Sequence, residues 1–251
     1  MTARNRNTKT LTRDSHSSMS ASSKSAISSS IASTLTSATL LAAAGGLLDA
    51  VVYLNHGHVF ANAMTGNVIF LGIAATGHEW AQILPHVAPI LAFLAGVLAA
   101  RLLRSAPLRH STLLTLSLEI VALFVVGFFP LDSPQLAYTV TIAFFSAFQV
   151  TTFRRVGRFT YNSTYVTGNL RDMAEGAFDS RFAPDPVQRE IGRAKFVKMG
   201  LICLCFVAGA AAGAFVAPRF PAHAVWFAEP MLLAVLFLTL LRPAEFAHHP
   251  A

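Results

Sequence analysis

The chain has 251 residues, of which 54% are hydrophobic and 12% are charged, and its mean hydropathy is +0.54. Soluble domains carry about 25% charged residues, so this deficit indicates a chain whose solvent is largely lipid. The formal net charge of +7 does not indicate nucleic-acid binding, because no RNA-binding signature and no aromatic-interleaved basic patch accompany it. Basic residues of membrane proteins gather in cytoplasmic loops beside anionic lipid.

Residues 1–34 form a basic segment rich in Ser and Thr. The segment contains too little apolar surface to fold, and we predict a disordered cytoplasmic tail. An organelle transit peptide has a similar composition and is the alternative. Residues 35–242 are predicted to form one polytopic membrane domain, and residues 243–251 a short C-terminal tail.

Six apolar runs have about the 18–20 residues that a bilayer requires. They cover approximately residues 35–54, 85–104, 112–130, 135–153, 197–217 and 223–241. Prolines such as Pro85 and Pro130 stand near their ends, where a missing backbone N–H costs least. Two further segments, 63–77 and 160–178, are too short or too polar to be full spans.

The distribution of basic residues favours six spans over eight. With six spans and both termini in the cytoplasm, 18 of the 19 Lys and Arg residues lie on the cytoplasmic side, in agreement with the positive-inside rule. With eight spans, seven of the 19 would lie outside. The rule is weaker for long loops, and the segment 154–198 is long.

The two halves of the chain, approximately 35–130 and 135–242, share an order of motifs that predicts an internal repeat. Thr65-Gly66-Asn67 aligns with Thr167-Gly168-Asn169, and a helix rich in small residues follows each triplet. An odd number of spans in each half would invert the second copy, as in many transporters. An extra charged stretch at about 179–198 is interpreted as a cytoplasmic insertion with an interfacial helix. Chance matching of short apolar runs is the alternative.

Each triplet suits a helix break at membrane depth, since Gly permits unusual backbone angles and Thr and Asn cap short helices. Helix N-termini would place partial positive charge there, which suits an anion or a polar neutral solute. The residues predicted to line a substrate path are Asp49, Asn62, Thr65, Gly66, Asn67, Gln149, Asn162, Tyr165, Thr167, Gly168 and Asn169. A helix break with satisfied caps and no solute is the alternative.

Asp49, Glu119 and Glu229 are the acids within the six apolar spans. An ionisable group in a span indicates function by default, and these three predict a site that handles protons or cations. Gln149 is the neutral counterpart of Asp49 in the second half. The alternative is hydrogen bonding between helices, especially for the two glutamates, because each is expected near a helix end.

Other polar features carry weaker signals. His56 and His58 follow the first span, where we expect an exposed loop and no metal site. Small-residue stripes at Ala92–Ala100 and Gly209–Gly213 predict close helix packing and also allow a homo-oligomer. The sequence has no serine nucleophile elbow, no His-Glu-x-x-His motif and no P-loop, so we predict no enzyme and no cofactor.

The paired motifs resemble those of the YoaK family of small multi-pass bacterial membrane proteins, a domain of unknown function. They are Gly45-Gly46-x-x-Asp49-Ala50-x-x-Tyr53, Asn62-x-Met64-Thr65-Gly66-Asn67 and Thr164-Tyr165-Val166-Thr167-Gly168-Asn169. The resemblance covers about residues 38–242 and implies a bacterial plasma-membrane protein, but no activity. Arg171-Asp172 departs from the apolar residues expected after the second triplet, which argues against a lipid-facing span there.

The sequence thus predicts an all-α membrane protein with about six transmembrane helices, two short broken or re-entrant helices that carry Thr-Gly-Asn, and two repeats. The leading hypothesis is a small-solute transporter or channel. Its partners would be the lipid bilayer and an unknown small solute, without nucleic acid. The alternative is a non-transporting scaffold, sensor or assembly partner, and a membrane-embedded lipid enzyme has less support.

Overall fold

The computed structural model describes residues 34–106, 111–130 and 134–241, and these residues are mostly helical. The predicted tails, up to residue 33 and from residue 243, lie outside the described residues. The elements are a first helix, Thr34–Asn55; α2, Met64–Thr76; α3, Trp80–Ser105; α4, Ser111–Val126; α5, Gln135–Thr152; β1, Arg155–Val156; β2, Phe159–Thr160; α6, Thr167–Phe182; α7, Pro186–Val216; the 3-10 helix η1, Ala224–Ala228; and α8, Glu229–Leu240.

Three of the described helices are long and apolar enough to cross a membrane, namely Thr34–Asn55, α3 and α7. Shorter apolar helices cover Met64–Thr76, Ser111–Val126 and Ala224–Leu240. Many large apolar side chains on the outside of these helices are exposed, among them Leu98, Leu204 and Phe237. An apolar exterior around a helical core is the arrangement that lipid requires.

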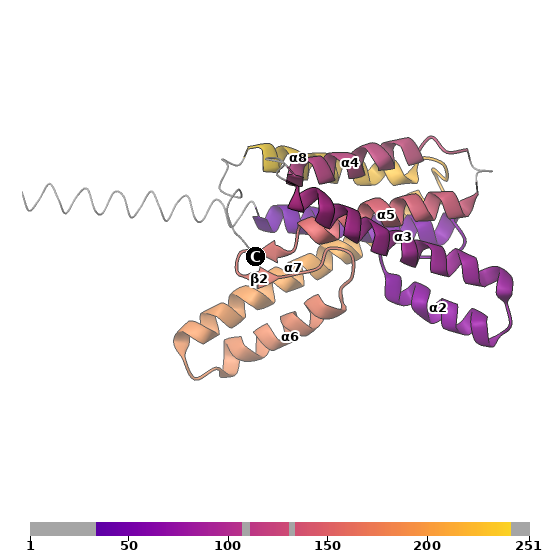
Figure 1. The fold of residues 1–251 in the computed structure, drawn as a ribbon. Coiled ribbons are helices and arrows are strands. Elements are labelled where there is room, and N and C mark those ends of the chain that lie inside the picture. The colour runs from indigo at the N-terminus through magenta and orange to yellow at the C-terminus, as the bar shows by residue number, and fades with distance from the viewer. Residues whose placement is uncertain (1–33, 107–110, 131–133, 242–251) are drawn as a thin grey trace, which may run out of the picture.

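The first helix, α4, α5 and α8 run side by side and enclose the main apolar core (Figure 1), which includes Leu48, Leu123, Ile142 and Leu232. The remaining helices form two hairpins, α2–α3 and α6–α7, which diverge from this layer. The turn of the α2–α3 hairpin lies at one end of the molecule and the turn of the α6–α7 hairpin at the other (Figure 1).

The long helix of each hairpin packs closely on a helix from the other half of the chain. Gly209 of α7 faces the carbonyl oxygen of Ala43 on the first helix, and Gly96 of α3 faces that of Phe144 on α5. A Cβ atom at either glycine would collide with the opposing backbone. The predicted packing role of both small-residue stripes is therefore confirmed, and the packing is intramolecular.

Two helix boundaries differ from prediction. Pro85 and Pro89 lie inside α3 rather than at its end, beyond the first turn, so each removes one backbone hydrogen bond of the helix. The helix α7 begins at Pro186, after Asp185 accepts a hydrogen bond from the N–H of Val187 at 3.0 Å. This Asp-Pro start extends one continuous helix through the stretch that was predicted to contain an interfacial helix.

A short antiparallel hairpin, which was not predicted, connects α5 with α6. Arg155 pairs with Thr160 and Val156 with Phe159. Gly157 forms its turn with φ of 63°, a left-handed conformation that suits glycine. The strands are too short to show the alternating pattern by which a sequence reveals a strand.

Candidate functional site

Asn67 anchors the segment that leads into α2. Its side-chain N–H donates to the carbonyl oxygen of Phe60 at 2.7 Å, and its side-chain oxygen accepts from the N–H of Phe60 at 2.9 Å. Asn67 is fully buried. The side chain thus satisfies both backbone groups of a residue outside any helix or strand, which fixes how the chain enters α2.

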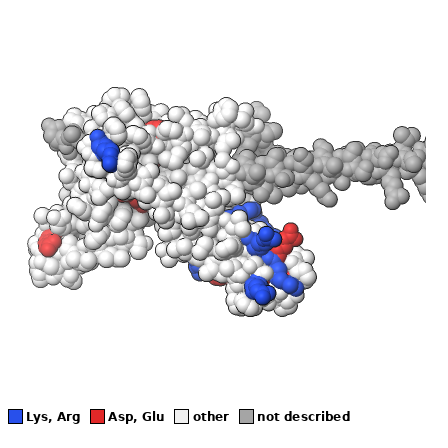
Figure 2. All heavy atoms as spheres, turned by 180° about the vertical axis from the view of Figure 1, so that it is seen from behind, with Lys and Arg blue, Asp and Glu red and all other residues white. Residues whose placement is uncertain are grey.

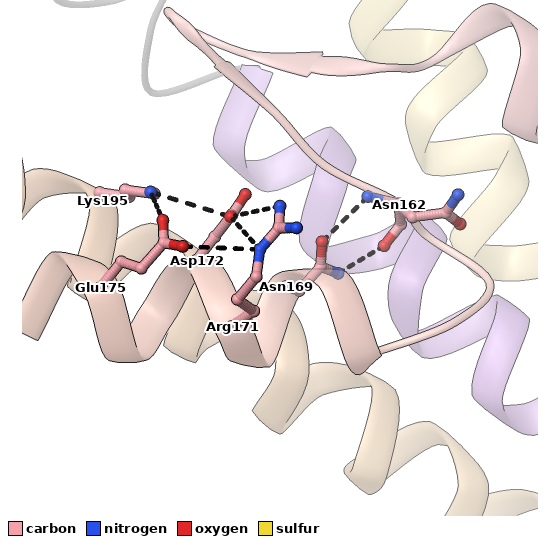
Figure 3. Close-up of polar contacts among 6 residues, drawn as sticks. All are labelled: Asn162, Asn169, Arg171, Asp172, Glu175 and Lys195. Carbon is pink, nitrogen blue, oxygen red and sulfur yellow. Dashed lines mark hydrogen bonds and ion pairs between the residues drawn. The ribbon is translucent and has the colours of Figure 1, made fainter.

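Asn169 makes the same pair of contacts before α6, again with the residue seven positions earlier (Figure 3). Its side-chain N–H donates to the carbonyl oxygen of Asn162 at 2.6 Å, and its oxygen accepts from the N–H of Asn162 at 3.0 Å. The side-chain oxygen of Asn162 then accepts from both the N–H and the hydroxyl of Thr164, each at 3.0 Å. The same pair of asparagine-to-backbone hydrogen bonds therefore precedes both α2 and α6.

The triplets do not cap their helices as predicted. The N-cap residues of α2 and α6 are Ala63 and Val166, and neither makes a side-chain cap hydrogen bond. The asparagines turn toward the preceding segment instead, because the buried backbone groups there would otherwise lack partners. The positions of the other predicted path residues differ: Thr65, Tyr165 and Thr167 are exposed, whereas Gly66, Asn162 and Gly168 are half-buried.

Asp49 holds the segment before α2 from the side of the first helix. Its Oδ1 accepts from the N–H of Asn62 at 2.8 Å, and the Asn62 side chain donates to the carbonyl oxygen of Gly45 at 3.3 Å. The amides of Ala61 and Ala63 also lie near the carboxylate, although Oδ2 makes no hydrogen bond of ordinary geometry. The buried carboxylate thus sits at the inside of a backbone turn.

Gln149 performs the corresponding task on α5. Its amide donates to the hydroxyl of Ser163 at 2.7 Å and to the carbonyl oxygen of Leu41 at 3.2 Å. Both Gln149 and Asp49 are almost completely buried. Each therefore holds the segment before a triplet-bearing helix against the central layer. Asp49 does so as a hydrogen-bond acceptor and Gln149 as a donor.

Two pockets lie beside the segment that leads into α2. A mostly apolar pocket of about 410 Å³ lies where the first helix, the segment before α2 and α7 meet, and Asp49, Phe60 and Phe206 line it. A larger pocket of about 560 Å³ lies between the α2–α3 hairpin and the rest of the molecule. Its polar and aromatic lining includes Tyr53, His56, His58, Glu79, Gln82, His86, Gln135 and Thr139. No triplet residue lines either pocket.

Sequence reasoning missed this larger pocket, because its two most informative side chains carry no clear local signal. His86 is a buried ionisable group in an apolar run, and its ring stacks on Phe70 of α2 at 5.3 Å. Gln135 begins α5, and its side chain reaches the backbone turn at Gly57. A single histidine in an apolar helix and a glutamine at a helix start are both common, so neither residue stands out without the fold.

His56 is not exposed as predicted, whereas His58 is. The His56 ring stacks on Tyr138 with ring centroids 3.6 Å apart, and its buried Nε2 has no hydrogen-bond partner. Burial lowers the pKa of His56 to about 4, so the imidazole that lines the pocket is neutral at physiological pH. Within the described ranges, no group of three or more His, Cys, Asp or Glu side chains is arranged to hold a metal ion.

The second hairpin carries charges instead of a pocket. Lys195 of α7 contacts Glu175 of α6 at 2.7 Å and Asp172 at 3.8 Å, and Arg171 contacts Asp172 at 3.0 Å (Figure 3). Figure 2 shows that Lys and Arg gather on this hairpin. Arg171 is largely exposed, so this part of α6 faces a polar environment.

The remaining predicted acids, Glu119 and Glu229, lie between α4 and α8, away from both triplets. Glu119 is in the middle of α4 and Glu229 starts α8, so only Glu229 lies near a helix end as predicted. Both side chains are buried, and they are close enough to repel each other.

Comparisons with known proteins agree with the resemblance that the motifs suggested. A family model described as "Protein of unknown function (DUF1275)" matches residues 37–238. The UPF0700 transmembrane protein YoaK of Bacillus subtilis (strain 168) is 24% identical over 214 residues, which cover 82% of this chain and 94% of that protein. No solved structure matches the chain significantly. The chain therefore belongs to the DUF1275 family and is similar to the transmembrane protein YoaK.

Proposed function

We propose that this protein is a small-solute transporter or channel of the bacterial plasma membrane, built from two inverted repeats with both termini in the cytoplasm. The first helix, α3, α4, α5, α7 and the η1–α8 segment would be the six spans. The shorter helices α2 and α6 would enter the membrane only partway. The observation that carries the proposal is the pocket of about 560 Å³ against α2, since ligand sites are concave and of this size.

The arrangement of the two hairpins supports inverted repeats. Asn67 and Asn169 make the same contacts seven residues back, and the turns of their hairpins lie at opposite ends of the molecule. The charges agree, because Lys and Arg gather on the α6–α7 hairpin and the positive-inside rule would place it in the cytoplasm.

The lining of the larger pocket suits a small polar neutral solute. Gln82, Gln135 and Thr139 offer hydrogen bonds, and the neutral imidazole of His56 adds no charge. Glu79 is the one acid in the lining. We propose that the solute enters here and that the path continues past Asp49 and the exposed triplet threonines, Thr65 and Thr167.

A thiol-labelling experiment tests the inverted arrangement. Cys203 and Cys205 are replaced by Ala, and single cysteines are placed at the exposed positions Gln82 and Arg189. An impermeant reagent should label Gln82→Cys from outside and Arg189→Cys from inside. Labelling of both from one side would overturn the inverted repeat.

Flux measurements test the transport proposal. Small polar solutes are first screened for thermal stabilisation of the purified protein, because a ligand of the folded state raises its stability. Uptake of the stabilising solute into proteoliposomes should fall at least tenfold in His86→Ala and Gln135→Ala variants. Glu190→Gln, an exposed change on α7, is the matched control. Flux that is equal in all these variants would contradict the assignment of the pocket.

One observation favours a non-transporting scaffold or sensor as the second candidate. The amides of Asn67 and Asn169 are already hydrogen-bonded to the protein's own backbone, so they offer a solute little. Under this reading Thr65→Cys and Thr167→Cys would resist labelling from both sides, and no solute would cross. The transporter proposal requires that at least one of these two thiols react and that a bound solute protect it.

A further inference from the structure

A pair of glutamates lies buried at the contact between α4 and α8. Glu119 is 0% exposed and Glu229 is 8% exposed, and the two carboxyl groups are close enough to interact electrostatically. Both side-chain oxygens of Glu119 and Oε1 of Glu229 have no hydrogen-bond partner among the described residues. The surroundings are apolar, with Leu116, Leu123 and Leu232 in the adjoining core.

Two ionised carboxylates would be unstable in this place. An isolated charge in an apolar interior costs many kcal/mol, and a second like charge beside it adds repulsion. A residue that merely fixed packing between helices would have a hydrogen-bond partner, as Gln149 has with Ser163. The glutamates therefore need an additional positively charged ligand.

The side chains around the two glutamates favour a proton over a metal cation as this ligand. Sodium and other hard cations require several oxygen ligands, whereas the core cluster that adjoins α4 and α8 is built mainly of leucines, valines and alanines. Hydrogen bonding of Thr115 with Thr152, at 3.3 Å, fixes α4 against α5. In this antiparallel register, Glu119 and Ser146 lie within about one helical turn of each other along the helix axes, and the hydroxyl of Ser146 also lacks a partner. One hydroxyl does not complete a metal site, but a carboxyl group needs only one proton.

We propose that Glu119 and Glu229 form a proton-binding site inside the membrane domain, in which the pair holds at least one proton at neutral pH. The other titratable groups on the elements packed against α4 and α8 are Asp49 and Tyr53 of the first helix, His86, Arg101 and Arg104 of α3, and Tyr138 of α5. Among the described residues, none of them forms a hydrogen bond with Glu119 or with Oε1 of Glu229. The site does not depend on the proposed transport, because proton binding can be measured without any solute.

Infrared spectroscopy of the full chain in lipid nanodiscs tests the site. Glutamate is labelled with ¹³C at the carboxyl carbon, so that aspartate signals separate from glutamate signals. Wild type at neutral pH should show a protonated glutamic-acid C=O band that shifts in D₂O. Glu79, Glu175 and Glu190 are exposed and should contribute carboxylate bands only. The band should disappear or shift in E119Q and in E229Q, whereas E190Q, the control, should leave it unchanged.

The decisive measurement is made on the wild-type protein, so it does not depend on whether any variant folds. Absence of a protonated glutamate band from the labelled wild type at neutral pH would show that both buried carboxyl groups are ionised. Loss of the band on addition of sodium at constant pH would show a cation site instead, and would also contradict it. A band that persists in the folded E119Q/E229Q double variant would assign the proton elsewhere.

Discussion

The α2–α3 hairpin and the α6–α7 hairpin follow one backbone plan with different side chains. In each, an asparagine in the first turn of the shorter helix bonds the backbone seven residues earlier, and the longer helix packs on the opposite half. The first hairpin adds Phe70 and His86 to a pocket. The second adds the ion pairs of Glu175 and Lys195. The two hairpins thus share their backbone contacts and differ in the side chains that they expose.

This difference indicates which contacts build the fold and which serve a task. Contacts present in both hairpins, above all those of Asn67 and Asn169, are expected to matter for stability. Features of one hairpin, such as His86 in the pocket or Lys195 in the charge cluster, are expected to matter for solute contact or for orientation in the membrane. Matched substitutions in the two hairpins can test this division.

The largest effect is expected where the long helices cross the opposite half. Gly209→Ala and Gly96→Ala each place a methyl group against a backbone carbonyl, which should lower the free energy of unfolding by about 3 kcal/mol. The measurement is thermal or denaturant unfolding of the purified protein in detergent. Gly72→Ala is the control, because no heavy atom lies within 4 Å of the added methyl. If Gly72→Ala destabilises as much as Gly209→Ala, the crossings are not the tight contacts described here.

The asparagine contacts come next. Asn67→Ala and Asn169→Ala each remove two hydrogen bonds and leave a backbone N–H and C=O without partners, which should cost about 2–3 kcal/mol. The same unfolding assay measures both losses. Thr65→Ala and Thr167→Ala change exposed neighbours and should cost little. A large difference between the two asparagine variants would show that the shared contact supports only one hairpin.

The glycines of the triplets should behave differently. A methyl at Gly66 meets the Phe60 ring, which is stacked against Tyr53 at 5.0 Å and cannot withdraw freely, so Gly66→Ala should cost about 1–2 kcal/mol. A methyl at Gly168 meets nothing within 4 Å. Gly168→Ala should therefore be neutral or stabilise by up to about 1 kcal/mol, since alanine favours a helix. Equal losses in the unfolding assay would contradict the asymmetry.

The remaining prediction concerns pH and only the first hairpin's pocket. The pKa of His56 falls from 6.5 to about 4 on folding, so the unfolded chain binds a proton that the folded chain does not. Stability should decline as the pH drops from about 6.5 to 4 and level off below that. His56→Phe keeps a ring against Tyr138 and should flatten this part of the profile. His58→Asn, at an exposed left-handed residue, should leave the slope as it is in wild type.

The sequence predicted the helices and the paired triplets because both are local signals. Apolar runs mark helices such as α4 and α5, and a repeated Thr-Gly-Asn is visible without a fold. The start of α7 was placed too late because charged residues such as Arg189 and Lys195 resemble a loop until their partners are known. The capping prediction failed because a local rule cannot show that Phe60 and Asn162 leave backbone groups unpaired nearby.

The pocket could not be predicted for a different reason. His86 and Gln135 are 49 positions apart in the sequence and meet only because α3 crosses α5. The pairing of Glu119 with Glu229 depends likewise on α4 packing against α8. Single-sequence reasoning identified both glutamates as unusual but had no means of bringing them together.

The crossing of the long helices has a consequence for synthesis. The first helix packs against α7, and α3 packs against α5. Both helices of the first half are therefore synthesised before the helices that they pack against. The Gly46 and Gly96 faces thus find their packing partners only after the second half has been inserted. Since each half supplies a helix that the other half packs against, the two halves, expressed as separate polypeptides in one cell, are expected to assemble into one protein.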